Sequence, residues 1–164
     1  CHVRDEEGLG AVVRLWQLRG LKFWKSSMPR TKIITLTDIH ILPNGERLIG
    51  IDPSERLALA IDHINRTQMD AEMVIVTGDL THRADARSYE LLKDGLSQLK
   101  LPVKLLIGNH DEREPFLEAF PQTPIDENGF VQFAFDLADW RLIGLDPLNG
   151  PPYIYPERHA GFLC

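Results

Sequence analysis

Side chains with metal-binding and acid–base chemistry follow three separate apolar runs of this chain. Short runs of branched residues that stop at polar residues or glycine are typical of buried strands that lead into loops. Carboxylate, imidazole and amide donors without thiolates suit Mn²⁺, Fe, Zn²⁺ or Co²⁺. The pattern therefore predicts a metal site that is assembled from three loops. Its candidate residues are Asp38 and His40 after the first run, Asp79 after the second, and Asn109, His110 and Asp111 after the third.

Alternating strands and helices are expected to position these loops. The periodicity predicts strands over Lys32–Thr37, Met73–Thr77 and Val103–Ile107, and helices over Pro53–Thr67 and Asp85–Leu99. This order predicts βαβ units and a largely parallel sheet in an α/β fold. The right-handed crossover rule places both helices on one face of that sheet. Ligands of open α/β sheets bind beyond the carboxyl ends of the strands, so the three loops should meet in one crevice.

The spacing of the polar residues suggests how they hold a cation. Asp38 and His40 are two residues apart, which places both side chains on the same side of an extended backbone. Gly78 and Gly108 free the backbone to turn sharply and to approach a ligand closely. Asp79 implies a second metal, because one carboxylate can bridge two ions about 3.5–4 Å apart. Such a pair supplies hydroxide as a nucleophile and neutralises charge that grows on a phosphoryl group.

The pattern changes after the third polar loop. A short helix is expected over Pro115–Ala119. The alternating runs Phe130–Phe135 and Trp140–Leu145 predict an antiparallel pair of strands with its turn near Ala138 and Asp139. The proline-rich remainder of the chain has no period and is expected to be a loop.

Composition limits the classes of partner. The chain is 43% hydrophobic and 26% charged, which is ordinary for one soluble domain. Its formal charge of −6, without a stripe of Lys and Arg, argues against a nucleic-acid polymer as partner. Two cysteines give no disulfide framework and favour a reducing, cytoplasmic location. The apolar stretch Leu9–Trp24 is interrupted by basic residues, so no membrane span is expected. Association into a homo-oligomer remains open.

The first methionine, Met28, stands immediately before the first strand-like run. We expect Met28 to be the natural start and residues 1–27 to be an extension: a leader, a tag or out-of-gene translation. Residues 28–164 would then form the amino-terminal part of one domain.

The order of the polar motifs resembles a known family. D-x-H at 38–40, G-D at 78–79 and G-N-H-D at 108–111, each after a strand, resemble the calcineurin-like metallophosphoesterase superfamily. The segments around these motifs are similar to the class III cyclic-nucleotide phosphodiesterase branch, which also contains glycerophosphodiesterases. The resemblance covers residues 31–164 and implies a β-sandwich flanked by helices in αββα layers, truncated at its C-terminus.

The resemblance also implies roles for the polar residues in hydrolysis of a small phosphodiester. A metal-bridging hydroxide would attack phosphorus, with 3′,5′-cyclic nucleotides as first substrate class and glycerophosphodiesters as second. Asp111 would orient the loop or His110, or would only cap the following helix. The implied roles are Asp38 and His40 on the first metal, Asp79 bridging both, Asn109 on the second through its amide oxygen, and His110 as a catalytic group facing the substrate.

The chain also departs from the family pattern. Members of the family continue with a further metal-binding histidine and a G-H-x-H motif, and neither occurs here. We therefore expect an incomplete ligand set and less than full activity from the chain as it stands. Two alternatives stay open: a nuclease or phosphatase of the same superfamily, and a metal-poor scaffold that binds partner proteins.

Four other polar residues have simpler interpretations. His82 and Arg83 follow the Gly-Asp motif and could reach a phosphate, but solvent-exposed residues at the entry to a helix are the favoured interpretation. Asp146 ends a strand, and a turn before Pro147 explains it adequately. His159 is interpreted as a surface residue of the proline-rich tail.

Overall fold

The computed structural model describes residues 31–148. Expectations for residues 1–27, Met28 and His159 lie outside this range. Within it the chain alternates strands and helices and then ends in a hairpin. The elements are β1 (Ile33–Thr37), α1 (Pro53–Thr67), β2 (Met73–Thr77), α2 (Ala86–Leu96), β3 (Val103–Leu106), α3 (Arg113–Ala119), β4 (Phe133–Leu137) and β5 (Trp140–Gly144).

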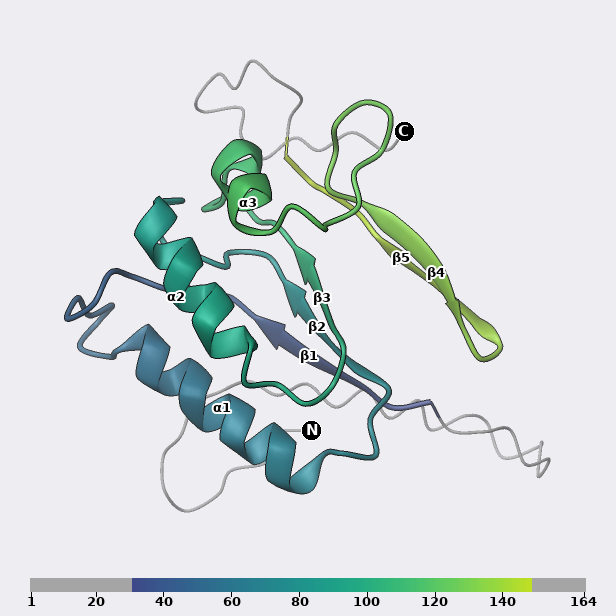
Figure 1. Ribbon diagram of the computed structural model, residues 1–164, viewed down its shortest axis with the longest axis horizontal. Helices are drawn as coiled ribbons and strands as arrows, with labels where there is room; N and C mark the ends of the chain where they lie inside the picture. Colours follow the sequence, from purple (N-terminus) through teal and green to yellow (C-terminus); the bar gives the residue numbers. More distant parts are fainter. Residues whose placement is uncertain (1–30, 149–164) are drawn as a thin grey trace.

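The first three strands form one parallel sheet in the order β1-β2-β3. The helices α1 and α2 pack on each other and cover one face of this sheet (Figure 1). The parallel sheet and the common face of the two helices are therefore confirmed. All three carboxyl ends lie at the same edge, which brings the loops after β1, β2 and β3 together.

Capping residues set the ends of the two long helices. Asp52 accepts hydrogen bonds from the backbone N–H groups of Ser54 and Glu55, and Pro53 occupies the first turn, where its missing N–H costs nothing. The predicted bounds of α1 are confirmed. The second helix is shorter than predicted at both ends, because Asp85 is its cap and the chain after Leu96 makes tighter turns.

The core lies between the parallel sheet and the two helices. Alternate residues of each strand point to opposite faces, so every second strand residue meets the apolar stripe of a helix. One buried cluster results, and it excludes water from the region directly beneath the carboxyl-end loops. Its main members are Ile34, Leu36, Val74, Val76 and Leu105 from the sheet and Leu57, Ile61, Ile64, Tyr89, Leu92 and Leu96 from the helices.

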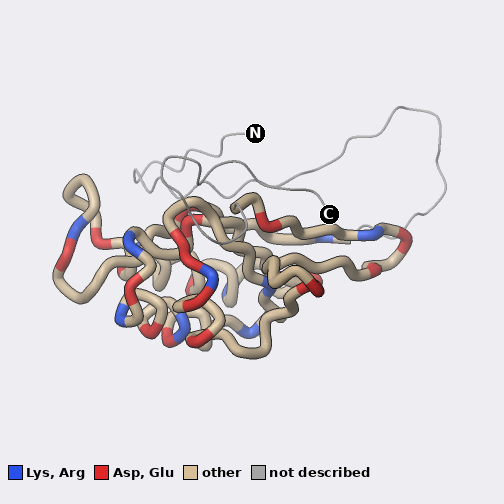
Figure 2. Tube along the Cα trace, turned by 90° about the horizontal axis from the view of Figure 1, so that it is seen from above, with Lys and Arg blue, Asp and Glu red and all other residues tan. Residues whose placement is uncertain are grey.

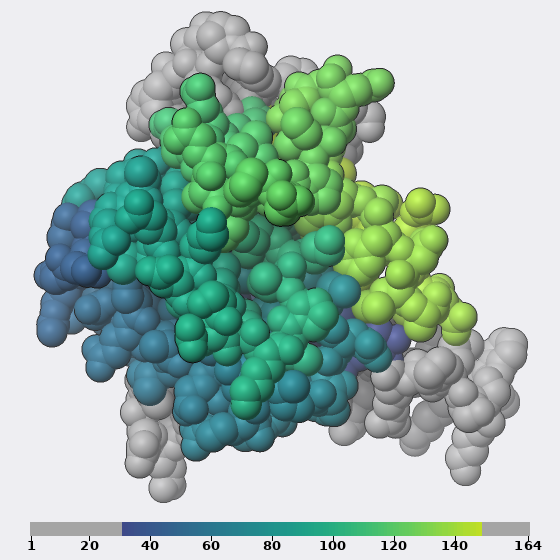
Figure 3. All heavy atoms as spheres, viewed as in Figure 1, coloured from purple at the N-terminus to yellow at the C-terminus, as the bar shows by residue number. Residues whose placement is uncertain are grey.

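The hairpin β4–β5 packs against the face of β3 that points away from the helices. Leu105 faces the helices, so its neighbours Lys104 and Leu106 face away from them. The Lys104 ammonium lies 5.9 and 5.7 Å from the ring centroids of Phe133 and Phe135 in β4. In the space-filling view the hairpin forms the yellow-green surface at the side of the molecule, next to the sheet (Figure 3). The hairpin therefore begins a second layer against the parallel sheet.

The antiparallel pairing and the position of the turn are confirmed, since Leu137 pairs with Trp140 across Ala138 and Asp139. The first strand of the pair was predicted too early, at Phe130. The backbone N–H of Phe130 instead donates to the Asp126 carboxylate at 2.8 Å, which ties this residue to a loop. The helix layer, the parallel sheet and the second antiparallel sheet agree with the expected α/β metallophosphoesterase fold.

None of the helices within residues 31–148 combines the length and the apolar character that a bilayer span requires.

Candidate metal centre

Three of the predicted ligands converge at the carboxyl edge of the sheet. One side-chain donor atom from each of Asp38, His40 and Asp79 lies within 4.8 Å of the other two. His40 Nε2 is 3.6 Å from Asp79 Oδ2. Asn109, from the loop after β3, lines the same cavity of about 400 Å³ as Asp38 and Asp79. All three loops therefore contribute to one site.

The backbone at this site is not extended, and the reason given for the convergence of Asp38 and His40 was wrong. Asp38, His40 and Asp79 have φ values of 54°, 51° and 45°, in the left-handed region. This conformation costs about 1–3 kcal/mol for a residue other than glycine and clusters at functional sites. A 2.8 Å hydrogen bond from the His40 N–H to the Asp79 carbonyl joins the two loops in this geometry. Strained turns, rather than the alternation of a strand, aim these side chains.

Close backbone packing explains both glycines beside the centre. Gly78 has a φ of 68°, which glycine adopts without steric cost. A Cβ atom on Gly108 would lie 2.3 Å from the backbone nitrogen of Asp79 and 2.4 Å from its Oδ1 atom. Those distances are far inside van der Waals contact, so only glycine permits the loops after β2 and β3 to approach this closely.

We expect Gly108→Ala to displace the Asp79 carboxylate and to weaken metal binding by about 10-fold or more, the scale on which loss of a supporting contact acts at a metal site. Calorimetric titration with Mn²⁺ measures the effect. Gly95→Ala in α2 is the control, because its Cβ would meet only the flexible end of Leu57. Equal Mn²⁺ affinity in the Gly108 variant and the wild type would contradict this account.

Asp111 is 2% exposed, and its side chain connects the loops after β2 and β3. Its carboxylate accepts hydrogen bonds from the backbone N–H groups of Leu80, Thr81 and Gly108 at 2.9, 3.1 and 2.9 Å. Tyr89 donates a further bond from its hydroxyl at 3.1 Å. Burial raises the pKa of Asp111, and these backbone bonds oppose the rise.

The alternative interpretation of Asp111 as a helix cap is wrong. The cap of α3 is Glu112, and its side chain makes no capping hydrogen bond. The Asp111 carboxylate is occupied instead by the loops after β2 and β3. It therefore supports the backbone on which Asp79 and Asn109 stand.

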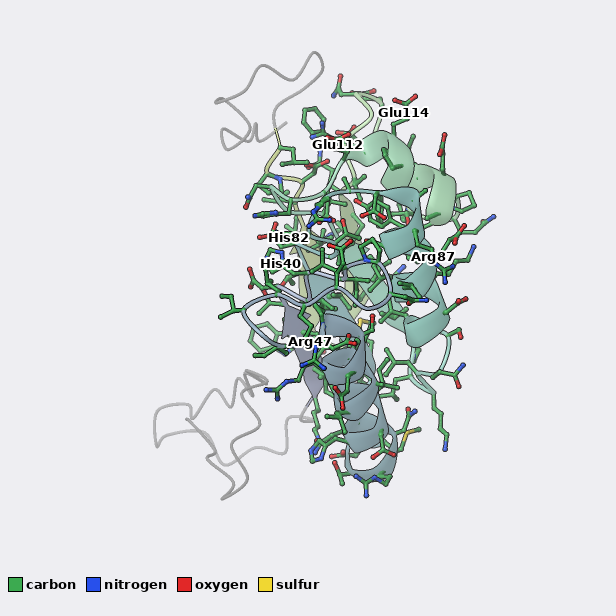
Figure 4. The ribbon with its side chains drawn as sticks, turned by 90° about the vertical axis from the view of Figure 1, so that its left-hand side faces the viewer. His40, Arg47, His82, Arg87, Glu112 and Glu114 are labelled. Atoms are coloured by element: carbon green, nitrogen blue, oxygen red, sulfur yellow. The ribbon has the colours of Figure 1, made fainter. Side chains whose placement is uncertain are left out.

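The favoured interpretation of His82 as a solvent-exposed residue was wrong, because its side chain is half-buried. Its ring lies beside that of His40, as Figure 4 shows, with the two Nδ1 atoms 3.4 Å apart. His110 packs against both rings, with centroids 4.7 Å from His40 and 5.0 Å from His82. Desolvation, assisted by the neighbouring imidazoles, lowers the pKa of His82 and favours its neutral form. Arg83 is exposed and pairs with Glu46 at 2.8 Å.

A second group of donors, the three imidazoles of His40, His82 and His110, also lies within 4.8 Å. The rings of His82 and His110 are stacked with an interplanar angle of 18°. Imidazole binds a metal through an in-plane lone pair, so two nearly parallel stacked rings direct their lone pairs along paths that do not converge. The geometry therefore favours the group with the two carboxylates as the metal centre.

One wall of the cavity is held by a buried ion pair. Arg113 Nε donates to Asp146 Oδ2 at 2.6 Å, and Arg113 Nη2 donates to the carbonyl of Leu148 at 2.8 Å. The Leu148 N–H returns a 3.0 Å bond to the other oxygen of Asp146. The interpretation of Asp146 as an ordinary turn residue was incomplete, because its buried carboxylate fixes the segment that carries Pro147 and Leu148 into the cavity.

The donor set fits the metal ions that the motifs imply. The carboxylates of Asp38 and Asp79 present oxygen atoms within 4.8 Å of each other. Two negative charges this close repel each other unless a cation lies between or beside them. An imidazole nitrogen and an amide oxygen complete a mixture that suits Mn²⁺, Fe, Zn²⁺ or Co²⁺.

The comparisons with known proteins agree with this geometry. Residues 31–161 match the model of the calcineurin-like phosphoesterase family. A probable cyclic nucleotide phosphodiesterase of Rhodopseudomonas palustris is 42% identical over 133 residues, which cover 81% of this chain and 47% of the relative. The 3′,5′-cyclic adenosine monophosphate phosphodiesterase CpdA of Pseudomonas aeruginosa is 28% identical over 130 residues, 77% of this chain and 46% of the relative.

A third relative carries a different substrate in its name. The probable glycerophosphodiester phosphodiesterase GpdQ of Arcobacter nitrofigilis is 29% identical over 124 residues, 74% of this chain and 45% of the relative. The chain thus spans about half the length of the curated relatives that it matches. The extent of the family match shows that the chain belongs to the calcineurin-like phosphoesterase family.

Proposed function

We propose that the protein is a metal-dependent phosphodiesterase that uses two ions and hydrolyses small phosphodiesters. The observation that carries this proposal is the convergence of Asp38, His40 and Asp79 within 4.8 Å in a member of a phosphoesterase family. Bound ions would supply a hydroxide nucleophile at neutral pH and offset charge on the phosphoryl oxygens.

The chain's own residues would hold and orient these components. Asp38 and His40 would bind one ion, Asp79 would be shared, and Asn109 would offer its amide oxygen to the other. His110 would face the substrate, where its Nε2 atom is available because Nδ1 donates to the carbonyl of His82 at 2.9 Å. In its imidazolium form, which carries a proton on Nε2 as well as on Nδ1, it would steady the phosphoryl group or give the Nε2 proton to the leaving oxygen.

Cyclic nucleotides are the preferred substrate class, because two of the relatives described above carry that activity in their names. Glycerophosphodiesters are the second class, supported by the third relative. The apolar wall formed by Leu145, Pro147 and Leu148 gives the cavity a surface for a base or an alkyl chain.

The remaining expectations concern partners and location. Acidic and basic residues are interspersed along the described chain in Figure 2, where no continuous basic stripe is visible. That distribution supports a small substrate over a nucleic-acid polymer. The cytoplasmic location is proposed on the sparse cysteine content alone.

Hydrolysis of bis(p-nitrophenyl) phosphate by the full-length protein tests the proposal. We expect activity that requires added Mn²⁺ and disappears with a chelator. Parallel assays with 3′,5′-cyclic AMP and a glycerophosphodiester rank the two substrate classes. No hydrolysis with Mn²⁺, Co²⁺, Zn²⁺ or Fe would overturn the proposal and favour a scaffold role.

A further inference from the structure

His82 lies where the loops after β1, β2 and β3 meet. Its backbone N–H donates to the carbonyl of Ile41 at 3.0 Å, and its carbonyl accepts the 2.9 Å bond from His110 Nδ1. Its ring stacks on His110 and stands edge-on to His40. These contacts fix both the backbone and the ring of His82 beside His40, one of the candidate metal ligands.

The two ring nitrogens of His40 face different partners. The Nε2 atom is 3.6 Å from Asp79 Oδ2, on the side of the two carboxylates. The Nδ1 atom is 3.4 Å from His82 Nδ1, within reach of a hydrogen bond. A nitrogen that binds a metal must keep its lone pair free, so metal binding at Nε2 requires the proton of His40 to reside on Nδ1.

That proton needs an acceptor, and His82 Nδ1 is the ring nitrogen that faces it. Histidines that bind metals almost always donate their second N–H to a neighbouring group, which fixes the tautomer and the orientation of the ring. Resting on the proposed metal-dependent function, we propose that His82 is a positioning residue whose Nδ1 atom accepts the Nδ1–H of His40 and so presents Nε2 to the metal.

His82 would then orient both imidazoles of the site by separate means. Its side chain holds His40, whereas its backbone carbonyl holds His110. A substitution at residue 82 removes the first contact and leaves the carbonyl in place. Variants of His82 therefore test the metal ligand without removing the partner of His110.

The test compares three variants in the full-length protein. His82→Ala removes the acceptor. His82→Asn keeps an acceptor, because the Oδ1 atom of asparagine occupies the place of the imidazole Nδ1 atom, whereas His82→Gln carries its oxygen one bond further out. Titration with Co²⁺ reports affinity by calorimetry and ligand geometry by the visible absorption of the bound ion. His63→Ala, at an exposed position of α1, is the matched control.

We expect His82→Ala and His82→Gln to bind Co²⁺ about 10–100-fold more weakly, as is typical for loss of an outer partner. His82→Asn should recover the affinity and the absorption spectrum of the wild type. Wild-type affinity in the Ala and Gln variants would overturn the inference, and so would an Asn variant as weak as the Ala variant. A wild-type protein that binds no Co²⁺ would instead overturn the metal centre itself.

Discussion

Replacing Asp79 with asparagine is expected to lower kcat for phosphodiester hydrolysis by at least about 100-fold, because loss of an outer partner of a metal ligand alone costs about 10–100-fold. The substitution removes the negative charge that both ions would share. It retains an oxygen that can accept the 3.0 Å bond from the His110 N–H, so the loops should stay in place. Activity and metal binding should therefore fall while the fold persists.

Hydrolysis of bis(p-nitrophenyl) phosphate and the amount of Mn²⁺ bound are the two measurements for this variant. Asp94→Asn, on the exposed side of α2, makes the same chemical change away from the site and should alter neither. Unchanged Mn²⁺-dependent hydrolysis in the Asp79 variant would refute a bridging role for this carboxylate.

The elements that carry the site could be predicted because their signals are local. Asp52 followed by Pro53 marks the start of α1, and the period of apolar residues carries it to Thr67. The strand β2 also has its predicted bounds, since a run of branched residues between polar segments defines it. The convergence of the polar loops followed from topology, because parallel strands end at one edge of a sheet.

Local signals failed where side chains outside the strand bind its backbone groups. The run that begins at Phe130 alternates like a strand, but Asp126 accepts the N–H of Phe130 and Asp146 accepts the N–H of Val131. Both groups are thereby lost to strand pairing. The left-handed turns at Asp38 and His40 were not predicted, because neither aspartate nor histidine requires a positive φ and the residue types therefore carry no signal for it.

The contacts around His82 could not be predicted from the sequence either. Its ring partner His40 is 42 residues away, and His110, which bonds to its carbonyl, is 28 residues away. Three histidines scattered over three loops carry no mark of their pairing until the sheet aligns those loops. The one available signal is a histidine three residues after the Gly-Asp motif. Once the three strands are known to be parallel, this histidine is expected to lie near the polar residues of the other two loops.

Asp111→Ala is expected to lower the free energy of unfolding by about 4–5 kcal/mol, because a buried donor left without a partner costs about 1–3 kcal/mol. The substitution removes the acceptor of three backbone N–H groups, on Leu80, Thr81 and Gly108, and of the Tyr89 hydroxyl. Burial raises the pKa of Tyr89, so its hydroxyl stays protonated and remains a donor that lacks this acceptor. The loops that carry Asp79 and Asn109 should therefore loosen together.

Urea denaturation at pH 7 measures the loss, and Mn²⁺ titration of the protein that remains folded measures its effect on the site. Asp126→Ala is a matched control, since Asp126 also accepts backbone N–H bonds, from Asn128 at 2.9 Å and Phe130 at 2.8 Å. Asp126 is only half-buried, so water can replace much of its carboxylate, and the control should lose far less stability than the fully buried Asp111. Equal losses in the two variants would show that Asp111 acts as an ordinary loop residue rather than as the link between the metal-binding loops.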